Sequence, residues 1–267
     1  RVVSFLVKSA DESSKVVSFT INGSNDAAVI GVPDDAAVTE DVDVLGGMLT
    51  ASGTISLFDI DDLESNFQTS VTSAAGNLGA LTLAANGEYT YSVANSAVQY
   101  LGEADTKIDT FTLTTLDGTA NQVSFVITGK NDIAVIGDPN NRSVTEDGGP
   151  DTVLSDGGAR LNTFGTISIS DIDQDESHFS QVVIDGSNQG LGSLKVESDG
   201  KYKFSVLNSH VQFLGAGDSR VVSFFVKSAD ESTKELSFTI NGINDAAVIG
   251  VPVDVAVTED VDVLGGM

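Results

Sequence analysis

Two short acidic motifs contain the residues whose types and spacing best suit chemistry. Asp59 and Asp61 are separated by one residue, and Asp171 and Asp173 repeat that spacing further along the chain. In a loop, both carboxylates of such a pair can point at one ion, because Ca²⁺ takes its ligands from closely spaced oxygens. The Asp-x-Asp spacing alone is a weak signal, so its meaning depends on the residues around it.

A second acidic signal is an Asn-Asp pair that occurs three times. The pairs are Asn25-Asp26, Asn131-Asp132 and Asn244-Asp245. Each follows an alternating, strand-like segment and precedes an apolar run almost at once, with Gly and Asn residues as breakers. So short a connection indicates the seam between two stacked domains, with the acidic residues held in it.

Internal repetition predicts the domain organisation. Residues 1–25 are identical to residues 220–244 at 20 of 25 positions. This self-similarity indicates a tandem array. We therefore expect 1–25 to be the C-terminal strands of a preceding repeat, 26–131 and 132–244 to be complete repeats, and 245–267 to be the N-terminal strand of a following one. Both ends would be cuts through a longer array. The second repeat is longer, chiefly by an insertion at 148–156.

Within each repeat, seven short strands separated by turn signals predict an all-β fold built from β-sandwiches. The Asn86-Gly87 dipeptide predicts a two-residue hairpin loop. The segment 95–102 is expected to contain one helical turn. The strands expected in the first repeat are 28–38, 53–58, 67–72, 78–84, 88–93, 109–115 and 122–128.

Alternating strand directions place the acidic residues at the two ends of each sandwich. The end where the chain enters each sandwich has four acidic residues. In the first repeat they are Asp59, Asp61, Glu64 and Asp117, and in the second they are Asp171, Asp173, Glu176 and Asp230. The end where the chain leaves has Glu40, Asp41, Glu103 and Asp105 in the first repeat, and Glu146, Asp147 and Asp218 in the second.

One complete seam can be assembled from these sets, and its charge predicts a bound cation. Its expected ligands are Glu40, Asp105, Asn131, Asp132, Asp171, Asp173 and Asp230. Two carboxylates ~4 Å apart repel by roughly 4 kcal/mol even at an effective dielectric constant near 20. Calcium takes six to eight oxygen ligands and suits such a seam better than magnesium, which requires octahedral geometry.

The same logic extends to the seams on either side. The expected ligands there are Asp26, Asp59, Asp61 and Asp117 before the first repeat, and Glu146, Asp218, Asn244 and Asp245 after the second. The alternative is an acidic surface that is solvated without a specific metal.

Composition excludes several classes of function. The formal net charge is −26, from 39 acidic and 13 basic residues. Nucleic acids and anionic membranes are therefore poor partners, since phosphate binding needs clustered cations. The absence of cysteine excludes disulfides, zinc–thiolate sites and cysteine catalysis. No apolar run approaches the length of a membrane span. A metal is then the usual substitute for a disulfide.

No set of residues predicts catalysis. His178 and His210 fall in loops at opposite ends of the second repeat, and the first repeat has Asn66 and Ala97 in their places. The Asp-x-Asp-x-x-Glu acids could imitate a glycosidase pair, but their loops lie at a seam rather than along a groove. No Gly-rich phosphate loop joins a strand to a helix. The sequence indicates a protein that is not an enzyme.

A series of motifs resembles the VCBS repeat over essentially the whole chain. In the first repeat these motifs are Val38-Thr39-Glu40-Asp41, Gly53-Thr54-Ile55, Asp59-Ile60-Asp61, Gly87-Glu88-Tyr89-Thr90-Tyr91, 95–102 and 127–132. In the second they are 144–147, 164–167, 171–173, Asn208-Ser209 and 240–245. The family usually has proline where this chain has Ala28, Ala134 and Ala247.

The resemblance implies a fold, a location and a role. VCBS repeats are similar to Ig-like and cadherin-like seven-stranded Greek-key sandwiches, arranged in elongated arrays within large secreted bacterial adhesins of the RTX type. Such adhesins leave the cell by type I secretion, so the expected location is extracellular or on the bacterial cell surface.

The leading hypothesis is a non-enzymatic extender of an adhesin, stiffened by calcium at its domain seams. Its partners would be calcium ions and the neighbouring repeats of a monomeric chain, with neither nucleic acid nor membrane insertion. The alternative is a carbohydrate- or protein-binding module, which an exposed aromatic platform would favour. Most Phe and Tyr residues instead alternate into the expected core.

Overall fold

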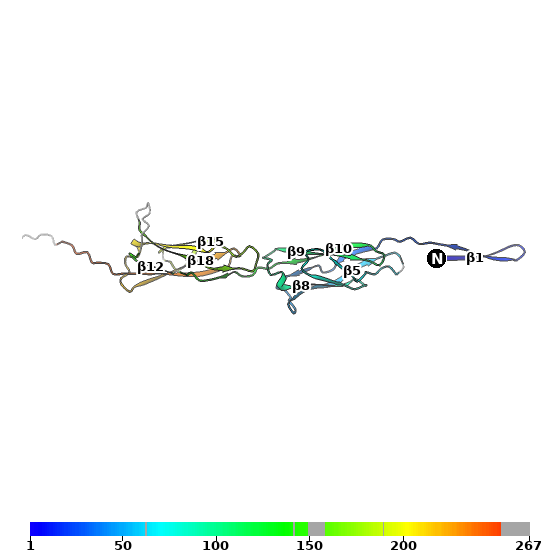
Figure 1. Cartoon of the computed structure of the whole chain (residues 1–267), viewed down its shortest axis with the longest axis horizontal. Coiled ribbons are helices and arrows are strands. Elements are labelled where there is room, and N and C mark those ends of the chain that lie inside the picture. The colour runs from blue at the N-terminus through cyan, green and yellow to red at the C-terminus, as the bar shows by residue number, and fades with distance from the viewer. Residues whose placement is uncertain (62, 141, 149–157, 189, 252–267) are drawn as a thin grey trace, which may run out of the picture. The chain divides into compact units, whose positions relative to one another are not determined.

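The computed structural model describes residues 1–61, 63–140, 142–148, 158–188 and 190–251 (Figure 1). Most of the predicted insertion at 148–156, and most of the predicted last segment at 245–267, lie outside the described residues. The chain divides into two compact units. Unit 1 consists of Arg1–Val135, Ile169–His178 and Ser228–Ser232. Unit 2 takes its described residues from Ile136–Ser168, Phe179–Lys227 and the segment from Thr233 onward.

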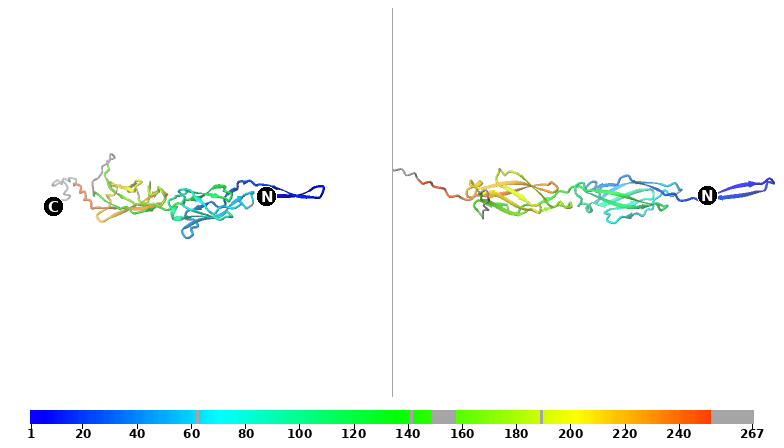
Figure 2. Two further views of the ribbon diagram at one scale, coloured as in Figure 1. Left: turned by 45° about the vertical axis from the view of Figure 1, so that its right-hand side comes forward. Right: turned by 90° about the horizontal axis from the view of Figure 1, so that it is seen from above.

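Unit 1 begins with an antiparallel hairpin, coloured dark blue in Figure 2, of β1 (Val2–Lys8) and β2 (Ser14–Thr20). The side chains of Phe5 and Phe19 are 55% and 57% exposed, and their rings contact each other edge to face. The corresponding residues of the near-identical stretch at 220–244 are Phe224 and Phe238, both fully buried. The two hairpins have the same register, with Phe5 opposite Val17 and Phe224 opposite Leu236.

The rest of unit 1 is a two-sheet sandwich with the strand order of an immunoglobulin-like fold. The first sheet has the order β3-β5-β8-β7 and the second the order β4-β10-β9-β6. The first sheet consists of β3 (Val29–Pro33), β5 (Met48–Phe58), β8 (Glu88–Ala94) and β7 (Ala80–Leu83). The second consists of β4 (Ala37–Thr39), β10 (Ala120–Thr128), β9 (Thr106–Thr114) and β6 (Thr72–Ser73). The predicted all-β sandwich is confirmed.

The strands of the second repeat have a similar arrangement, and most of them belong to unit 2, whereas β14 belongs to unit 1. One sheet has the order β12-β19-β18-β15, another the order β13-β17-β16, and β11 pairs with β14. The bounds are β11 (Val135–Ile136), β12 (Ser143–Thr145), β13 (Arg160–Thr166), β14 (Ile169–Ser170), β15 (Phe179–Asp185), β16 (Ser193–Val196), β17 (Lys201–Leu207), β18 (Ser219–Ser228) and β19 (Thr233–Asn241). Short 3₁₀ turns, η1 (Asn95–Ala97) and η2 (Asn208–His210), follow β8 and β17, as the sequence predicts.

Alternating apolar residues fill the space between the two sheets of each sandwich. In unit 1 the rings of Tyr91 and Phe125 stack 4.6 Å apart, and Phe111 meets both edge to face. In unit 2, Phe204 and Phe238 form the same stack at 4.7 Å. These aromatic residues join the two sheets, so the acidic loops at the strand ends are carried on a rigid scaffold.

Two predicted strands differ from the structure. The single strand expected at 28–38 is wrong, because β3 stops at Pro33 and β4 resumes at Ala37 in the other sheet. Proline has no N–H to continue the ladder. The strand expected at 67–72 is mostly irregular. Phe67 faces Thr115 and Thr72 faces Thr112, so the longer segment bulges away from its neighbour.

The hairpin loop and the second strand also need correction. Ala84 N–H donates to the Glu88 carbonyl at 2.8 Å, which leaves three residues between them. The loop is therefore one residue longer than Asn86-Gly87 alone indicates, with Gly87 at φ +88°. The strand expected to begin at Gly53 begins at Met48, and Gly53 lies inside β5, where an added Cβ would stand 3.0 Å from the Tyr89 hydroxyl.

Candidate cation-binding site

The first acidic loop follows β5 directly. Asp59, Asp61 and Glu64 each bring one carboxylate oxygen to within 4.8 Å of the others. Asp59 is the most deeply placed, at 8% exposed. Because β5 ends at Phe58, the loop starts where the sheet stops supplying backbone partners, and the side chains supply them instead.

Hydrogen bonds with backbone N–H groups and with Ser65 satisfy some polar atoms of this loop, whereas two of its carboxylate oxygens accept none. Asp61 N–H donates to Asp59 Oδ1 at 2.9 Å, and Asp26 N–H donates to Asp61 Oδ2 at 2.8 Å. Ser65 Oγ accepts the Asp59 N–H at 3.1 Å. Asp59 Oδ2 and Glu64 Oε2 are buried and accept no hydrogen bond. Burial, followed by repulsion from Asp61 and Asp59, raises the pKa of Glu64.

Asp117 borders the same loop but is saturated with donors. Its carboxylate accepts hydrogen bonds from the hydroxyls of Thr115 and Thr119 and from the backbone N–H groups of Thr119 and Ala28. The hydroxyl hydrogen bonds, that of Thr115 first, hold the pKa of Asp117 well below its usual range. Asp117 therefore supplies a fixed negative charge beside Glu64 and orients the chain at Ala28.

The second acidic loop, Ile169–His178, belongs to unit 1 and repeats the first one contact for contact. Asp173 N–H donates to Asp171 Oδ1 at 3.0 Å, and Asp132 N–H donates to Asp173 Oδ2 at 2.8 Å. Ser177 Oγ accepts the Asp171 N–H at 2.8 Å. The buried oxygens that accept no hydrogen bond are Asp171 Oδ2, Asp173 Oδ1 and Glu176 Oε2.

Two further acids of unit 1 lie close to this second loop. Asp132 Oδ2 is another buried oxygen without a donor. Glu40 is fully buried and accepts hydrogen bonds from Gln99 Nε2 at 2.6 Å and from Lys130 N–H at 3.4 Å. Four unsatisfied carboxylate oxygens and a buried glutamate thus gather in one unit, around an aspartate that is 2% exposed, Asp173.

The pKa shifts of these acids record the crowding of negative charge. Burial raises the pKa of Glu40 to about 7, against a hydrogen bond from Lys130 N–H and with repulsion from Asp132, Asp41 and Asp173. Burial also raises the pKa values of Asp132, Asp173 and Glu176, and each of these groups is repelled by Asp171. Carboxyl groups in this state lack a counter-charge.

Asp230 is the exception, in the way that Asp117 is at the first loop. Burial raises its pKa, but hydrogen bonds from Ser228, Ser232 and the Ala134 N–H outweigh burial and bring the pKa to about 2. Asp230 is therefore ionised and already bonded. It adds negative charge to the second loop, and it has little unused hydrogen-bonding capacity.

Two residues predicted at this site lie at its rim. Asp105 is exposed, and its charge contributes to the raised pKa of Glu176. Asn131 uses its side-chain amide on the neighbouring Asp132 carbonyl at 2.9 Å, while its own N–H donates to Glu103 at 3.4 Å. Both positions are nearer to solvent than Asp173.

The acids predicted after the second repeat border the segment that follows β19, where Gly242 N–H donates to the Asp218 carbonyl at 3.0 Å. Glu146 is fully buried and accepts hydrogen bonds from Gln212 and from the Ile243 N–H. Asp218 is exposed and accepts from Gly215 N–H at 3.1 Å. Asn244 and Asp245 are exposed. Within the ranges that the structure describes, no Asp-x-Asp loop accompanies these residues in unit 2.

Sequence reasoning left three residues out of the predicted ligand sets. Glu64 and Glu176 complete the two acidic loops, and their signal was the extended spacing Asp-x-Asp-x-x-Glu, which occurs twice. Gln99 contacts Glu40, and no pattern of acidic residues could have found it. Gly102 allows a close approach, because a Cβ placed there would stand 2.8 Å from Glu176 Oε1.

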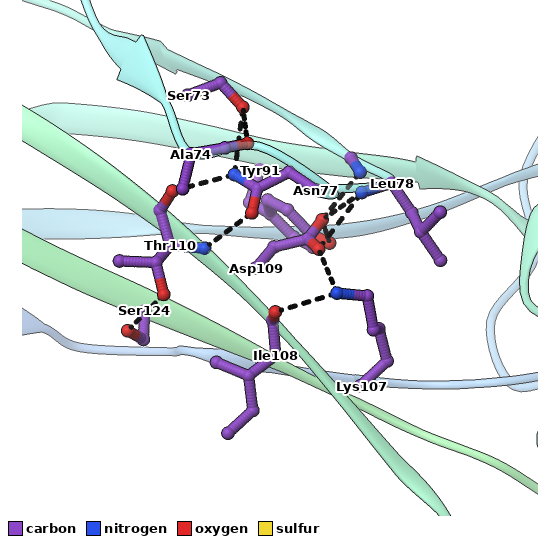
Figure 3. A network of polar contacts seen from close by, with 11 residues as sticks. Ser73, Ala74, Asn77, Leu78, Tyr91, Lys107, Ile108, Asp109, Thr110 and Ser124 are labelled. Atoms are coloured by element: carbon purple, nitrogen blue, oxygen red, sulfur yellow. Dashed lines mark hydrogen bonds and ion pairs between the residues drawn. The ribbon is translucent and has the colours of Figure 1, made fainter.

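Asp109 shows what a purely structural buried acid looks like in this protein (Figure 3). It is fully buried, and its carboxylate accepts hydrogen bonds from Leu78 N–H at 3.0 Å, Gly79 N–H at 2.6 Å and the Tyr91 hydroxyl at 2.8 Å. Lys107 Nζ lies 3.9 Å away. Both oxygens of Asp109 are bonded, whereas those of the acidic loops are not.

The donor set of the acidic loops fits a hard cation. All the unsatisfied atoms are carboxylate oxygens, which Ca²⁺ prefers, and buried polar atoms without partners are rare in folded proteins unless an ion or a water satisfies them. The loops provide several such oxygens on backbone-anchored side chains. Glu40, Asp132, Asp171, Asp173 and Glu176 would hold an ion at the second loop. Asp59, Asp61 and Glu64 would hold one at the first.

The comparisons with known proteins show similarity to other proteins in backbone structure only. No protein-family model matches the chain, and no curated protein matches it. Similar solved structures include PcdhgB3 EC1-4 (TM-score 0.44, 10% identity, covering 92% of this chain and 65% of that one). The protocadherin gamma B4 extracellular domain has a TM-score of 0.45 at 11% identity, covering 90% of this chain and 42% of that one. The human desmocollin-1 ectodomain has a TM-score of 0.33 at 12% identity, with 90% and 41% covered.

The chain thus spans 65% and 42% of the two protocadherin chains. The strand order of the two sheets, described above, defines the fold independently of this likeness. Among the described residues, no helix is long and apolar enough to cross a membrane. Fold and site together define a class, an all-β protein of tandem Ig-like sandwiches that carry acidic loops at their strand ends.

Proposed function

We propose that this chain is a non-enzymatic spacer from a large secreted or surface-attached protein, and that its acidic loops bind Ca²⁺. The observation that carries the proposal is the set of six buried carboxylate oxygens without hydrogen bonds, which belong to Asp59, Glu64, Asp132, Asp171, Asp173 and Glu176. A calcium ion supplies the counter-charge and the coordination that these oxygens lack.

A bound ion would connect residues of successive repeats. Glu40 directly follows strand β4 of the first repeat, and Asp132 lies in the connection between the two repeats. Asp171, Asp173 and Glu176 come from the second repeat. Coordination of one ion by both groups would fasten the second repeat to the end of the first. Without the ion, like charges would repel, and the connection would become flexible. This is how calcium would stiffen an extended array.

The motifs that resemble the VCBS repeat support a bacterial adhesin as the parent protein, with a location outside the cell. An extender needs neither catalytic residues nor a ligand groove, and it benefits from repetition of a single module. The near-identity of 1–25 and 220–244 fits a part whose copies are interchangeable.

Calcium-dependent stability tests the proposal. An ion that binds only the folded protein stabilises it by about 2.7 kcal/mol when its concentration is 100 times the dissociation constant. With sites of ~10⁻⁴ M, typical of extracellular modules, 10 mM Ca²⁺ should raise the melting temperature clearly above that in chelator. Magnesium at the same concentration should do less. Identical melting curves in calcium and in chelator would refute the proposal.

A further inference from the structure

The buried carboxylate of Glu40 is held by an amide rather than by a cation. Gln99 Nε2 lies 2.6 Å from Glu40 Oε1, and the same nitrogen lies 3.0 Å from Asp41 Oδ1. Glu40 Oε2 meets the Lys130 N–H at 3.4 Å. Both oxygens of Glu40 therefore have a donor, although no positively charged side chain contacts either one in the described structure.

Asn95 fixes the other end of this arrangement. Its side-chain nitrogen donates to Asp41 Oδ1 at 2.6 Å, and its side-chain oxygen accepts the Asp41 N–H at 3.0 Å. Asp41 has φ +55°, a left-handed conformation that this pair of hydrogen bonds holds in place. Asn95 and Gln99 belong to the turn that begins at η1, so one short segment orients two successive acidic residues.

The same contacts recur in unit 2, where the motifs that make them, 144–147 and 208–215, closely match 38–41 and 95–102. Gln212 Nε2 lies 2.7 Å from Glu146 Oε1 and 3.2 Å from Asp147 Oδ1. Asp147 N–H donates to Asn208 Oδ1 at 3.2 Å, and Asp147 has φ +50°. A hydrogen-bond set that is kept in both units is a built feature of the fold.

We propose that Gln99 is a positioning residue for the cation site, which holds the Glu40 carboxylate in the orientation that the ion requires. This inference rests on the proposed function and adds a residue that is not itself a ligand. A neutral amide can only donate to an ionised carboxylate, so it orients the ligand without competing for its charge. Partners of this kind typically contribute 10- to 100-fold to metal affinity.

The experiment is a calcium titration of the full chain, followed by NMR at the backbone amides of Asp132 and Asp173. The N–H of Asp132 is bonded to Asp173, so these signals report on the second loop itself. The variant Gln99→Met keeps the length of the side chain and removes the donor. Its matched control is Gln212→Met, which makes the same change in unit 2.

We expect Gln99→Met to need about tenfold more calcium than the parent to reach half of the shift at these amides. Gln212→Met should titrate there like the parent. The melting temperatures of the two variants in chelator should be lowered equally, because each loses the same hydrogen bonds. A purely structural role for Gln99 would lower stability without moving the calcium midpoint.

The outcomes separate the two proposals. If the parent titrates and Gln99→Met has the same midpoint, the positioning role is wrong and the calcium proposal stands. If the parent amides do not respond to calcium, both proposals fail. If Gln99→Met does not fold, Asn95→Ser decides by the same midpoint, because Asn95 holds the Asp41 side of the arrangement. An unshifted midpoint in Asn95→Ser would then overturn the inference.

Discussion

The two acidic loops of unit 1 have the same internal design and different neighbours. In each, the N–H of the second aspartate bonds to the first, and a serine hydroxyl accepts the N–H of the first. In each loop, the first aspartate and the glutamate have one buried carboxylate oxygen that accepts no hydrogen bond. The second loop also adjoins Glu40, whose pKa is raised by burial and then by repulsion from Asp132, Asp41 and Asp173. The Asp-x-Asp-x-x-Glu loop therefore supplies part of each candidate site, and at the second loop Glu40 and Asp132 supply further carboxylates.

The most direct way to break this comparison is to remove the central ligand of one loop. Asp173→Asn should weaken calcium binding at the second loop about 100-fold, the upper end of the loss typical of outer-shell changes, because a neutral amide replaces a carboxylate that is only 2% exposed. Asp61→Asn, the corresponding change in the first loop, should leave the second loop unaffected. NMR titration at the Asp132 amide distinguishes them, and equal effects of the two variants would show that the loops are not independent.

The second loop should also make the calcium-free protein sensitive to pH. The pKa of Glu40 is about 7, against an ordinary 4.5, so its contribution to stability is fully present below pH 4.5 and is lost as the pH rises through 7. The pKa values of Asp132, Asp173 and Glu176 are raised as well and act in the same direction. Each released proton gives a slope of at most about 1.4 kcal/mol per pH unit.

Denaturant unfolding in chelator between pH 4.5 and 7.5 should therefore show stability that falls as the pH rises. Calcium should restore it at the upper end, where the ligands are ionised. Glu40→Gln should flatten the slope, whereas Glu146→Gln serves as the matched variant in unit 2. Stability that rises across this range in chelator would contradict the crowding of charge at the second loop.

A third change concerns the connection between the repeats. Asp132→Ala removes one bare oxygen but keeps the backbone N–H that bonds to Asp173. We expect a roughly tenfold loss of calcium affinity at the second loop, and a shorter average maximum dimension in small-angle scattering with calcium present. Far-ultraviolet circular dichroism should be unchanged, because the sandwich cores are elsewhere. A variant as extended as the parent would show that calcium does not stiffen the connection.

The smallest effect is expected from a change that only crowds the second loop. Gly102→Ala places a Cβ 2.8 Å from Glu176 Oε1, and the flexible end of Glu176 can move away at little cost in stability. Calcium affinity should fall slightly through this displaced ligand, by less than in Asp132→Ala. Gly215→Ala is the control, since its Cβ would meet Asp218 at an ordinary 3.5 Å. Equal calcium midpoints for both variants would exclude Glu176 as a ligand.

The sequence predicted most of this architecture because its signals are local. Alternation between Leu81 and Leu83, and between Tyr89 and Tyr91, identifies strands without any knowledge of their partners. The split of the first strand was not predicted, since Pro33 ends pairing with one sheet but cannot reveal that β4 joins the other. The bulge after Phe67 was not predicted either, because it depends on the length of the segment that faces it in the neighbouring strand.

The site was predictable in its acids and not in their states. Strand counting placed Glu40, Asp132 and Asp173 in one region, and the structure places them together in unit 1. It could not show that Asp117 and Asp230 are saturated by hydroxyl donors while Asp171 and Glu176 keep bare oxygens. That distinction depends on which serine and threonine hydroxyls the turns bring within reach.

The parallel pairing of β4 with β10 has a mechanical consequence. Val38 faces Ile127 in this pair, and because the strands are parallel, the chain approaches β4 from one end of the sandwich and leaves β10 at the other. Tension applied along the chain would pull these two strands in opposite directions, so their hydrogen bonds would be loaded in shear and together, instead of one after another. Glu40 follows β4 directly, so an ion held there would add to the resistance. Single-molecule pulling should record a higher unfolding force with calcium than with chelator.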